Sequence, residues 1–303
     1  MPLAAMSPAW QRKVDASLTI PRSTPLTPQT MPTFTPLASL LAARGRLESG
    51  VRFEVPEDWL QGRTSFGGLI SVMAVQAMRD VAGAAWPDDV KLRALQTSFI
   101  GPVAQGPVEV AVTLLREGKN VRQVQALVRQ SGQTAALLLG VFGSERDTAV
   151  LPLSPKKPPV ETEPDRTPLR SLPTGAAPSF TQHMDMRFAG GGAPFTGMPS
   201  TTSRIHLQLK GEPASGIPTE LLTVLLADVP PTPLLAQFTK PTPASSVSWE
   251  LELRPLPQAT EGWWRADTDV LAAAGGYSNQ ATRLWSPDGE LAALGYQVVT
   301  VYG

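Results

Sequence analysis

Cysteine is absent from the 303-residue sequence, and histidine occurs only as His183 and His206. Without cysteine the chain can form no disulfide, use no thiolate nucleophile and build no cysteine-based metal site. The small histidine count and the missing G-x-S-x-G segment disfavour both a Ser-His-Asp hydrolase and a histidine-rich zinc site. The phosphate-binding pattern G-x-x-x-x-G-K-[ST] is missing too. Catalysis is therefore expected to use carboxylate, hydroxyl, amide and backbone groups, with neither metal nor cofactor.

Long hydrophobic runs and an excess of one charge are also missing. The longest apolar run, residues 135–143, is too short to cross a bilayer, and the N-terminal segment lacks the hydrophobic stretch of a secretory signal. The 26 acidic and 26 basic residues cancel without forming a basic cluster. We therefore expect no nucleic-acid partner and no membrane span, and a cytoplasmic location.

Proline is abundant, and its distribution divides the chain. One cluster precedes residue 37, and residues 151–178 contain eight prolines and few apolar residues. This composition is typical of an extended surface linker. The predicted organisation is an N-terminal extension at 1–35, a first domain at 36–150, a linker at 151–178 and a second domain at 179–303.

Each predicted domain contains one strongly apolar helix and a run of strands. In the first, the segment after "GRTSFGG" is apolar around nearly its whole circumference, which predicts a buried helix beginning near residue 69. A strand at 51–55 precedes it, and strands follow at about 92–103, 107–117, 120–130 and 133–144. In the second, strands near 181–188 and 202–210 precede the apolar stretch "LLTVLLAD", and strands follow at about 246–255, 261–272, 278–286 and 290–301.

The sequences of the last predicted hairpins in the two halves align without gaps, which indicates an internal duplication. "SGQTAALLLGVF" (131–142) matches "DGELAALGYQVV" (288–299), so that Gly132 falls on Gly289 and Gly140 on Gln297. A helix that is apolar on all sides and wrapped by a curved antiparallel sheet is the hot-dog architecture. The predicted fold class is therefore α+β, a double hot-dog. Two unrelated α+β domains remain the alternative.

With this arrangement of segments, the sequence resembles the type II, double hot-dog acyl-CoA thioesterases and their thioesterase-like relatives. The matching segments are "RTSFGGLISVMAVQAM", "LQTSFIGPV" and "LLREGKNVRQVQALVRQSGQTA" in the first half, and "LLADVPPTP", "SSVSWELELRP" and "LWSPDGELAALGYQVVTVYG" in the second. The resemblance implies cytosolic hydrolysis of acyl-CoA to a free acid and CoA. It also implies that an acid, a hydroxyl and an amide hold the attacking water, and these fall on Asp228, Ser245 and Gln297.

Two patterns bear on these assignments. In "SSVSWELEL", Ser245 has the parity of the apolar residues Val247 and Trp249, so it is expected to face inward while Ser246 faces out. Gln297 has only glycine, Gly140, as its counterpart in the other repeat. A requirement of the sheet itself would appear in both copies, so one active site per chain is expected.

Plainer interpretations stay open for the same residues. Asp228 could end a helix before Val229-Pro230-Pro231 with its carboxylate in water. Gly67 and Gly68 could only let the helix start close to a strand, or a backbone N–H there could face the substrate, which makes them candidate binding residues.

Other functions and an assembled state also stay open. The alternative function is a non-catalytic acyl or acyl-CoA binding protein. A dehydratase using His206 ranks lower, because that residue lies outside the central helices. Exposed sheet edges make a homo-oligomer plausible.

Overall fold

Residues 34–160, 162–167, 177–256 and 261–303 are described by the structure, a computed structural model. The predicted extension at 1–35 lies outside these ranges except for its last two residues, as do residues 161 and 168–176 of the predicted linker. Residues 34–303 group into one unit, to which the following description applies.

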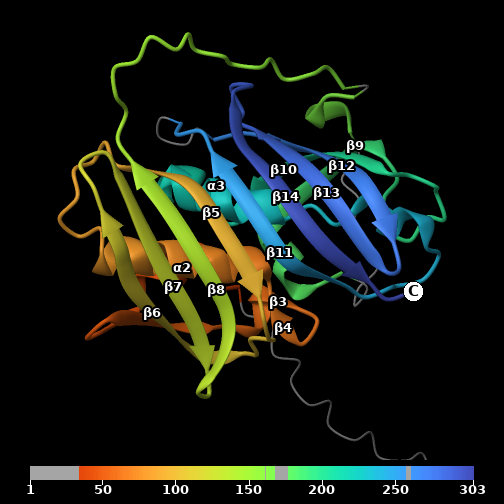
Figure 1. The fold of residues 1–303 in the computed structure, drawn as a ribbon. Helices are drawn as coiled ribbons and strands as arrows, with labels where there is room; N and C mark the ends of the chain where they lie inside the picture. The colour runs from red at the N-terminus through yellow and green to blue at the C-terminus, as the bar shows by residue number, and fades with distance from the viewer. Residues whose placement is uncertain (1–33, 161, 168–176, 257–260) are drawn as a thin grey trace, which may run out of the picture. The chain divides into compact units, whose positions relative to one another are not determined.

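A single antiparallel sheet of twelve strands runs through both halves of the described chain (Figure 1). Its order is β1-β2-β6-β7-β8-β5-β11-β14-β13-β12-β10-β9. The strands are β1 (Gly45–Leu47), β2 (Gly50–Val55), β5 (Lys91–Phe99), β6 (Gly106–Glu117), β7 (Val121–Gln130), β8 (Gln133–Gly143), β9 (Met184–Gly191), β10 (Thr202–Leu209), β11 (Ala244–Leu253), β12 (Trp264–Ala274), β13 (Tyr277–Trp285) and β14 (Leu291–Val301).

The sheet order confirms the double hot-dog and shows how its repeats are joined. Strands β2, β6, β7, β8 and β5 of the first half occupy the same relative places as β10, β12, β13, β14 and β11 of the second. The two sets meet where β5 pairs with β11, for example Leu95 opposite Leu251. Gly132 and Gly289, which the duplication aligns, both have positive φ in hairpin turns. The β5–β11 junction was not predicted.

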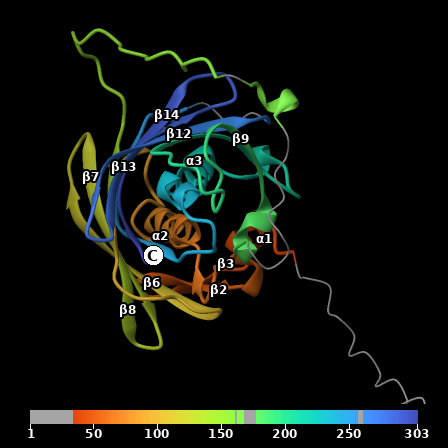
Figure 2. The same ribbon diagram turned by 90° about the vertical axis from the view of Figure 1, so that its right-hand side faces the viewer.

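Two helices lie side by side in the concave interior of the sheet (Figure 2). Helix α2 (Gly67–Val81) is buried along most of its length, and α3 (Thr219–Asp228) is buried from Leu221 to Ala227. Each fully buried leucine, isoleucine or valine contributes about 1.5–3 kcal/mol by leaving water. The apolar sequence of both helices therefore follows from burial on every side, as predicted.

Short elements complete the described chain. Helix α1 (Leu37–Ala42) precedes β1, and β3 (Leu60–Gln61) pairs with β4 (Thr64–Ser65) just before α2. The described residues also form five short 3-10 helices: η1 (Glu57–Trp59), η2 (Pro164–Arg166), η3 (Ser179–His183), η4 (Ala214–Gly216) and η5 (Pro233–Gln237).

The described part of the proline-rich segment contacts the second repeat. Arg187 on β9 donates from Nη1 to the carbonyl oxygens of Pro164, at 2.6 Å, and Thr167, at 3.0 Å. The division of the chain at 151–178 remains our proposal.

Candidate active site

Asp228 is the last residue of α3, and its carboxylate lies against protein groups while keeping partial access to water. Leu221 to Ala227 anchor the helix in the interior, and Pro230 and Pro231 prevent it from continuing, because proline lacks the N–H that a helix needs. The solvent-exposed helix end considered from the sequence is therefore not what the structure contains. The helix places one partly buried carboxylate against groups of both repeats, Gly67 and Gly68 of the first and Gln297 of the second.

Two donors from other elements hold this carboxylate. The side-chain Nε2 of Gln297 on β14 donates to Asp228 Oδ1 at 2.7 Å, and the backbone N–H of Gly68 donates to the same carboxylate. Gly68 lies in the first turn of α2, where N–H groups have no partner within the helix and the helix dipole favours negative charge. The structure thus brings the predicted pair Asp228 and Gln297 together, and adds the start of α2 to them.

Gly67 and Gly68, at the start of α2, are each required to be glycine for a different steric reason. A Cβ on Gly67 would stand 2.9 Å from Asp228 Oδ2 and 3.0 Å from Cζ of Phe99, so any side chain would displace the carboxylate or the ring. A Cβ on Gly68 would stand 2.6 Å from the ring of Phe66 and 3.1 Å from the carbonyl oxygen of Leu225 on α3. Gly67 therefore leaves space for the carboxylate, and Gly68 allows the two helices to approach closely.

Burial raises the pKa of Asp228 from 3.8 to about 7, although the hydrogen bonds from Gln297 and Gly68 lower it in part. A carboxyl group with this pKa is present in both protonation states near neutral pH. It can therefore take a proton from water and return it later, as a general base needs to do.

The hydroxyl group expected from Ser245 is displaced by a β-bulge. The pairing of β11 with β14 shifts register between Ser246 and Ser248, so Val247 has no partner on β14. Beyond this bulge Ser246 pairs with Val299 on the inner face, whereas the exposed Ser245 pairs with Thr300 on the outer face. The parity prediction for these two serines is therefore wrong, because the extra residue exchanges the faces. The structure brings Ser246, and not Ser245, to the face that carries Gln297.

The equivalent position in the first repeat is closed. A Cβ on Gly140 would stand 2.7 Å from Sδ of Met78, so in this repeat a thioether lies where Asp228 meets Gln297 in the other. Neither methionine nor glycine can activate water. This arrangement supports one site per chain.

A second amide behind Gln297 escaped the sequence analysis. Gln280 on β13 is opposite Gln297 in the register, and its Nε2 donates to Gln297 Oε1 at 2.9 Å. The signal was present in "YSNQATRLW", where Ser278, Gln280 and Thr282 share the inward parity. Three polar residues on the buried face of a strand indicate a polar interior.

His206 lies away from this site. Its neighbours Ile205 and Leu207 belong to the core, so His206 is on the outer face of β10, where Nε2 is 3.2 Å from the carbonyl oxygen of Thr162. In the strand register, His206 lies opposite Arg265 of the neighbouring strand β12. No group of three or more histidine, aspartate or glutamate residues able to hold a metal occurs in the described ranges.

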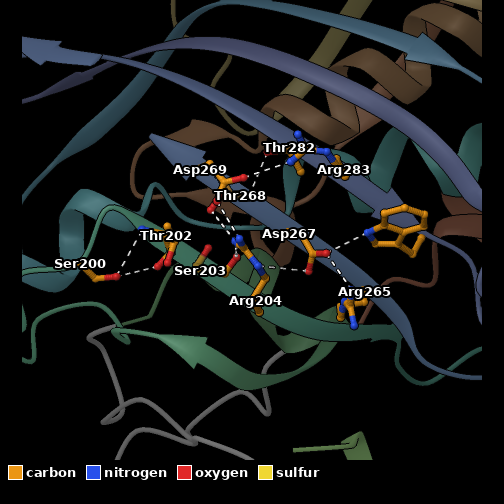
Figure 3. Close-up of polar contacts among 11 residues, drawn as sticks. Ser200, Thr202, Ser203, Arg204, Arg265, Asp267, Thr268, Asp269, Thr282 and Arg283 are labelled. Carbon is orange, nitrogen blue, oxygen red and sulfur yellow. Dashed lines mark hydrogen bonds and ion pairs between the residues drawn. The ribbon is translucent and has the colours of Figure 1, made fainter. Parts of the chain in front are cut away.

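A separate cluster of paired charges spans β10, β12 and β13 (Figure 3). Asp267 accepts hydrogen bonds from Arg265 and from the indole of Trp285, at 2.8 and 2.9 Å. Asp269 bonds Arg204 at 2.8 Å and Arg283 at 3.1 Å. Because each carboxylate here is bound by arginine, the cluster fits a structural role in joining the strands rather than proton transfer.

Two sequence profiles of acyl-CoA thioesterase domains match this chain. The sequence profile of the acyl-CoA thioesterase N-terminal domain matches residues 55–143, and that of the C-terminal domain matches residues 155–301. No curated protein sequence matches the chain significantly. In the described part of the chain, no helix has both the length and the apolar character needed to cross a membrane.

Solved structures share the fold at low sequence identity. A hot-dog protein of unknown function from Alicyclobacillus acidocaldarius superposes with a TM-score of 0.74 at 18% identity, covering 89% of this chain and 99% of its own. An acyl-CoA thioesterase II from Mycobacterium marinum gives 0.67 at 18% identity, covering 88% and 98%. A TesB protein from Mycobacterium avium gives 0.67 at 17% identity, covering 88% and 98%.

Proposed function

Since the chain belongs to the acyl-CoA thioesterase family, we propose that it hydrolyses acyl-CoA to a free carboxylic acid and CoA by direct attack of water. The observation that carries this proposal is the half-buried carboxylate of Asp228, whose pKa lies near 7 and which is held by Gln297 and Gly68. A thioester carbonyl is electrophilic enough for water to attack once a base removes its proton. No covalent nucleophile is needed.

In the proposed reaction, Asp228 takes a proton from water while the water oxygen bonds to the thioester carbonyl carbon. The tetrahedral intermediate then collapses, the C–S bond breaks, and the CoA sulfur leaves with the proton that Asp228 returns. Gln297 orients the carboxylate. Ser246 replaces Ser245 in our proposal as the hydroxyl that orients the water, because it lies on the inner face.

The start of α2 supplies a donor for the developing oxyanion in this scheme. The backbone N–H of Gly67 donates to no acceptor among the described residues, and it is adjacent to the Gly68 N–H that holds Asp228. A free N–H at a helix N-terminus is suited to an oxygen that becomes negative. We therefore retain Gly67 and Gly68 as substrate-binding residues. A cytoplasmic location and a homo-oligomer remain predictions.

The test is release of CoA from a panel of acyl-CoAs that differ in chain length, followed with a thiol-reactive dye. Because the chain contains no cysteine, the protein gives no background in this assay. We expect release by the wild type and near-complete loss in Asp228→Ala, with the circular dichroism spectrum retained. Saturable binding of acyl-CoA without any CoA release would support the binding-protein alternative instead.

A further inference from the structure

Gln280 forms the second link of a hydrogen-bonded chain that ends at the proposed catalytic carboxylate. The side chain is 3% exposed, and it reaches Asp228 only through Gln297, at 2.9 Å for the first bond and 2.7 Å for the second. Its amide is not among the hydrogen-bond donors to the carboxylate, which are Gln297 and Gly68. Any effect of Gln280 on Asp228 must therefore pass through the orientation of the Gln297 amide.

The charge of Asp228 dictates the direction of both bonds. An ionised carboxylate can only accept, so Gln297 must present its NH₂ group to Asp228 and its carbonyl oxygen to β13. The NH₂ group of Gln280 satisfies that oxygen at 2.9 Å. This orientation leaves Oε1 of Gln280 buried without a hydrogen-bond partner among the described residues. An apolar side chain would avoid such an unsatisfied acceptor, which indicates that this position requires the donor.

We propose that Gln280 is a positioning residue for Asp228, acting through Gln297. Its NH₂ group fixes the Gln297 amide so that nitrogen, and not oxygen, faces the carboxylate. Without this restraint the amide of Gln297 can rotate by a half turn and place its oxygen against Asp228. The kinetic consequence rests on the proposed function, whereas the effect on ionisation of Asp228 does not.

The surroundings of Asp228 make this one bond important. The groups that hydrogen-bond it are the N–H of Gly68 on α2 and the amide of Gln297 on β14, and the start of α2 at Gly67 lies against its Oδ2 atom. No charged side chain in the described part of the chain contributes to the shift of its pKa. Two hydrogen bonds alone therefore offset the burial of the carboxylate. Losing the defined orientation of one of them should raise its pKa further.

The test compares Gln280→Met, which keeps the length of the side chain without a donor, with Thr282→Val as the matched control. Thr282 is buried on the same face two residues along β13, and its hydroxyl bonds Thr268 at 3.0 Å outside the chain of amides (Figure 3). Both variants remove one buried hydrogen bond from one strand. Gln280→Thr, which suits a strand and cannot reach Gln297, replaces the methionine variant if that fails to fold.

In Gln280→Met we expect kcat to fall roughly tenfold with little change in KM, and the lower limb of the pH–kcat profile to move up by roughly 0.5–1 pH unit. Thr282→Val should leave the limb in place. In a Gln297→Met background the same change at position 280 should have no further effect. An unmoved limb in Gln280→Met, or an equal shift in both backgrounds, would overturn the proposal.

A second measurement separates this proposal from the function. The difference in the pH dependence of unfolding between a protein with Asp228 and the same protein carrying Asp228→Asn reports the ionisation of Asp228. This measurement does not depend on catalytic activity. Gln280→Met should extend the Asp228-dependent loss of stability to higher pH. If the wild type hydrolyses no thioester, this measurement still decides whether Gln280 positions Asp228.

Discussion

Replacing Asp228 with asparagine should change how the stability of this protein depends on pH. Burial raises the pKa of Asp228 from 3.8 to about 7. Well below pH 4 the carboxyl is protonated in both folded and unfolded chains. As the pH rises, the unfolded chain loses this proton first, so the folded chain binds more protons until about pH 7. The free energy of unfolding therefore falls through this window and is constant above it with respect to this group.

The size of the effect follows from the two pKa values. Across the whole titration of Asp228, the free energy of unfolding falls by about 4 kcal/mol. About 2.5 kcal/mol of this loss occurs between pH 5 and pH 8. Because the half-buried carboxylate keeps partial access to water, we expect about 1–2.5 kcal/mol over that interval. Asparagine cannot ionise and loses this dependence. Asparagine also offers a single carbonyl oxygen to the two donors, Gln297 and the Gly68 N–H. This mismatch lowers the free energy of unfolding by about 1–2 kcal/mol at every pH.

The assay is urea unfolding of the wild type and Asp228→Asn at pH 5, 6, 7 and 8. The variant should gain stability relative to the wild type as the pH rises, while CoA release is lost at every pH. Asp147→Asn serves as the control because it makes the same chemical change at an exposed position. If the difference for Asp228→Asn were the same at pH 5 and pH 8, the carboxylate would not be desolvated and the reasoning would fail.

Three other substitutions test the geometry of the site. Gly67→Ala should lower kcat by roughly tenfold or more, because its Cβ would displace the carboxylate, whereas Gly45→Ala, which meets nothing within 4 Å, should leave kcat unchanged. Ser246→Ala should lower kcat more than Ser245→Ala does; equal effects in a CoA-release assay would contradict the exchange of faces by the bulge. Gly140→Ala should lower the free energy of unfolding by about 1–2 kcal/mol through overpacking. A large loss of kcat in that folded variant would argue against a single site in the second repeat.

Several features of this protein were determined by local sequence alone. The residues of α2 and α3 are apolar around the helix, which occurs only where a helix is enclosed, so the buried helices could be predicted from periodicity. The aligned hairpins around Gly132 and Gly289 predicted the duplication. Gln297 stood out because its counterpart is glycine, and the structure brings it to Asp228 as a direct hydrogen bond.

The remaining features depend on which strands meet and how they are registered. A parity count assumes one residue per step, and the bulge at Val247 adds one, so the inward serine became Ser246. The parity of Ser278, Gln280 and Thr282 marks a polar face of β13, but the partner of Gln280 follows only from the register that places it opposite Gln297. The pKa of Asp228 is set by its burial and by hydrogen bonds from α2 and β14, which reach it only on folding. Sequence therefore determined which elements form and which carboxylate they carry, whereas cross-strand register and burial decided its partners and its acidity, because both depend on residues far apart in the chain.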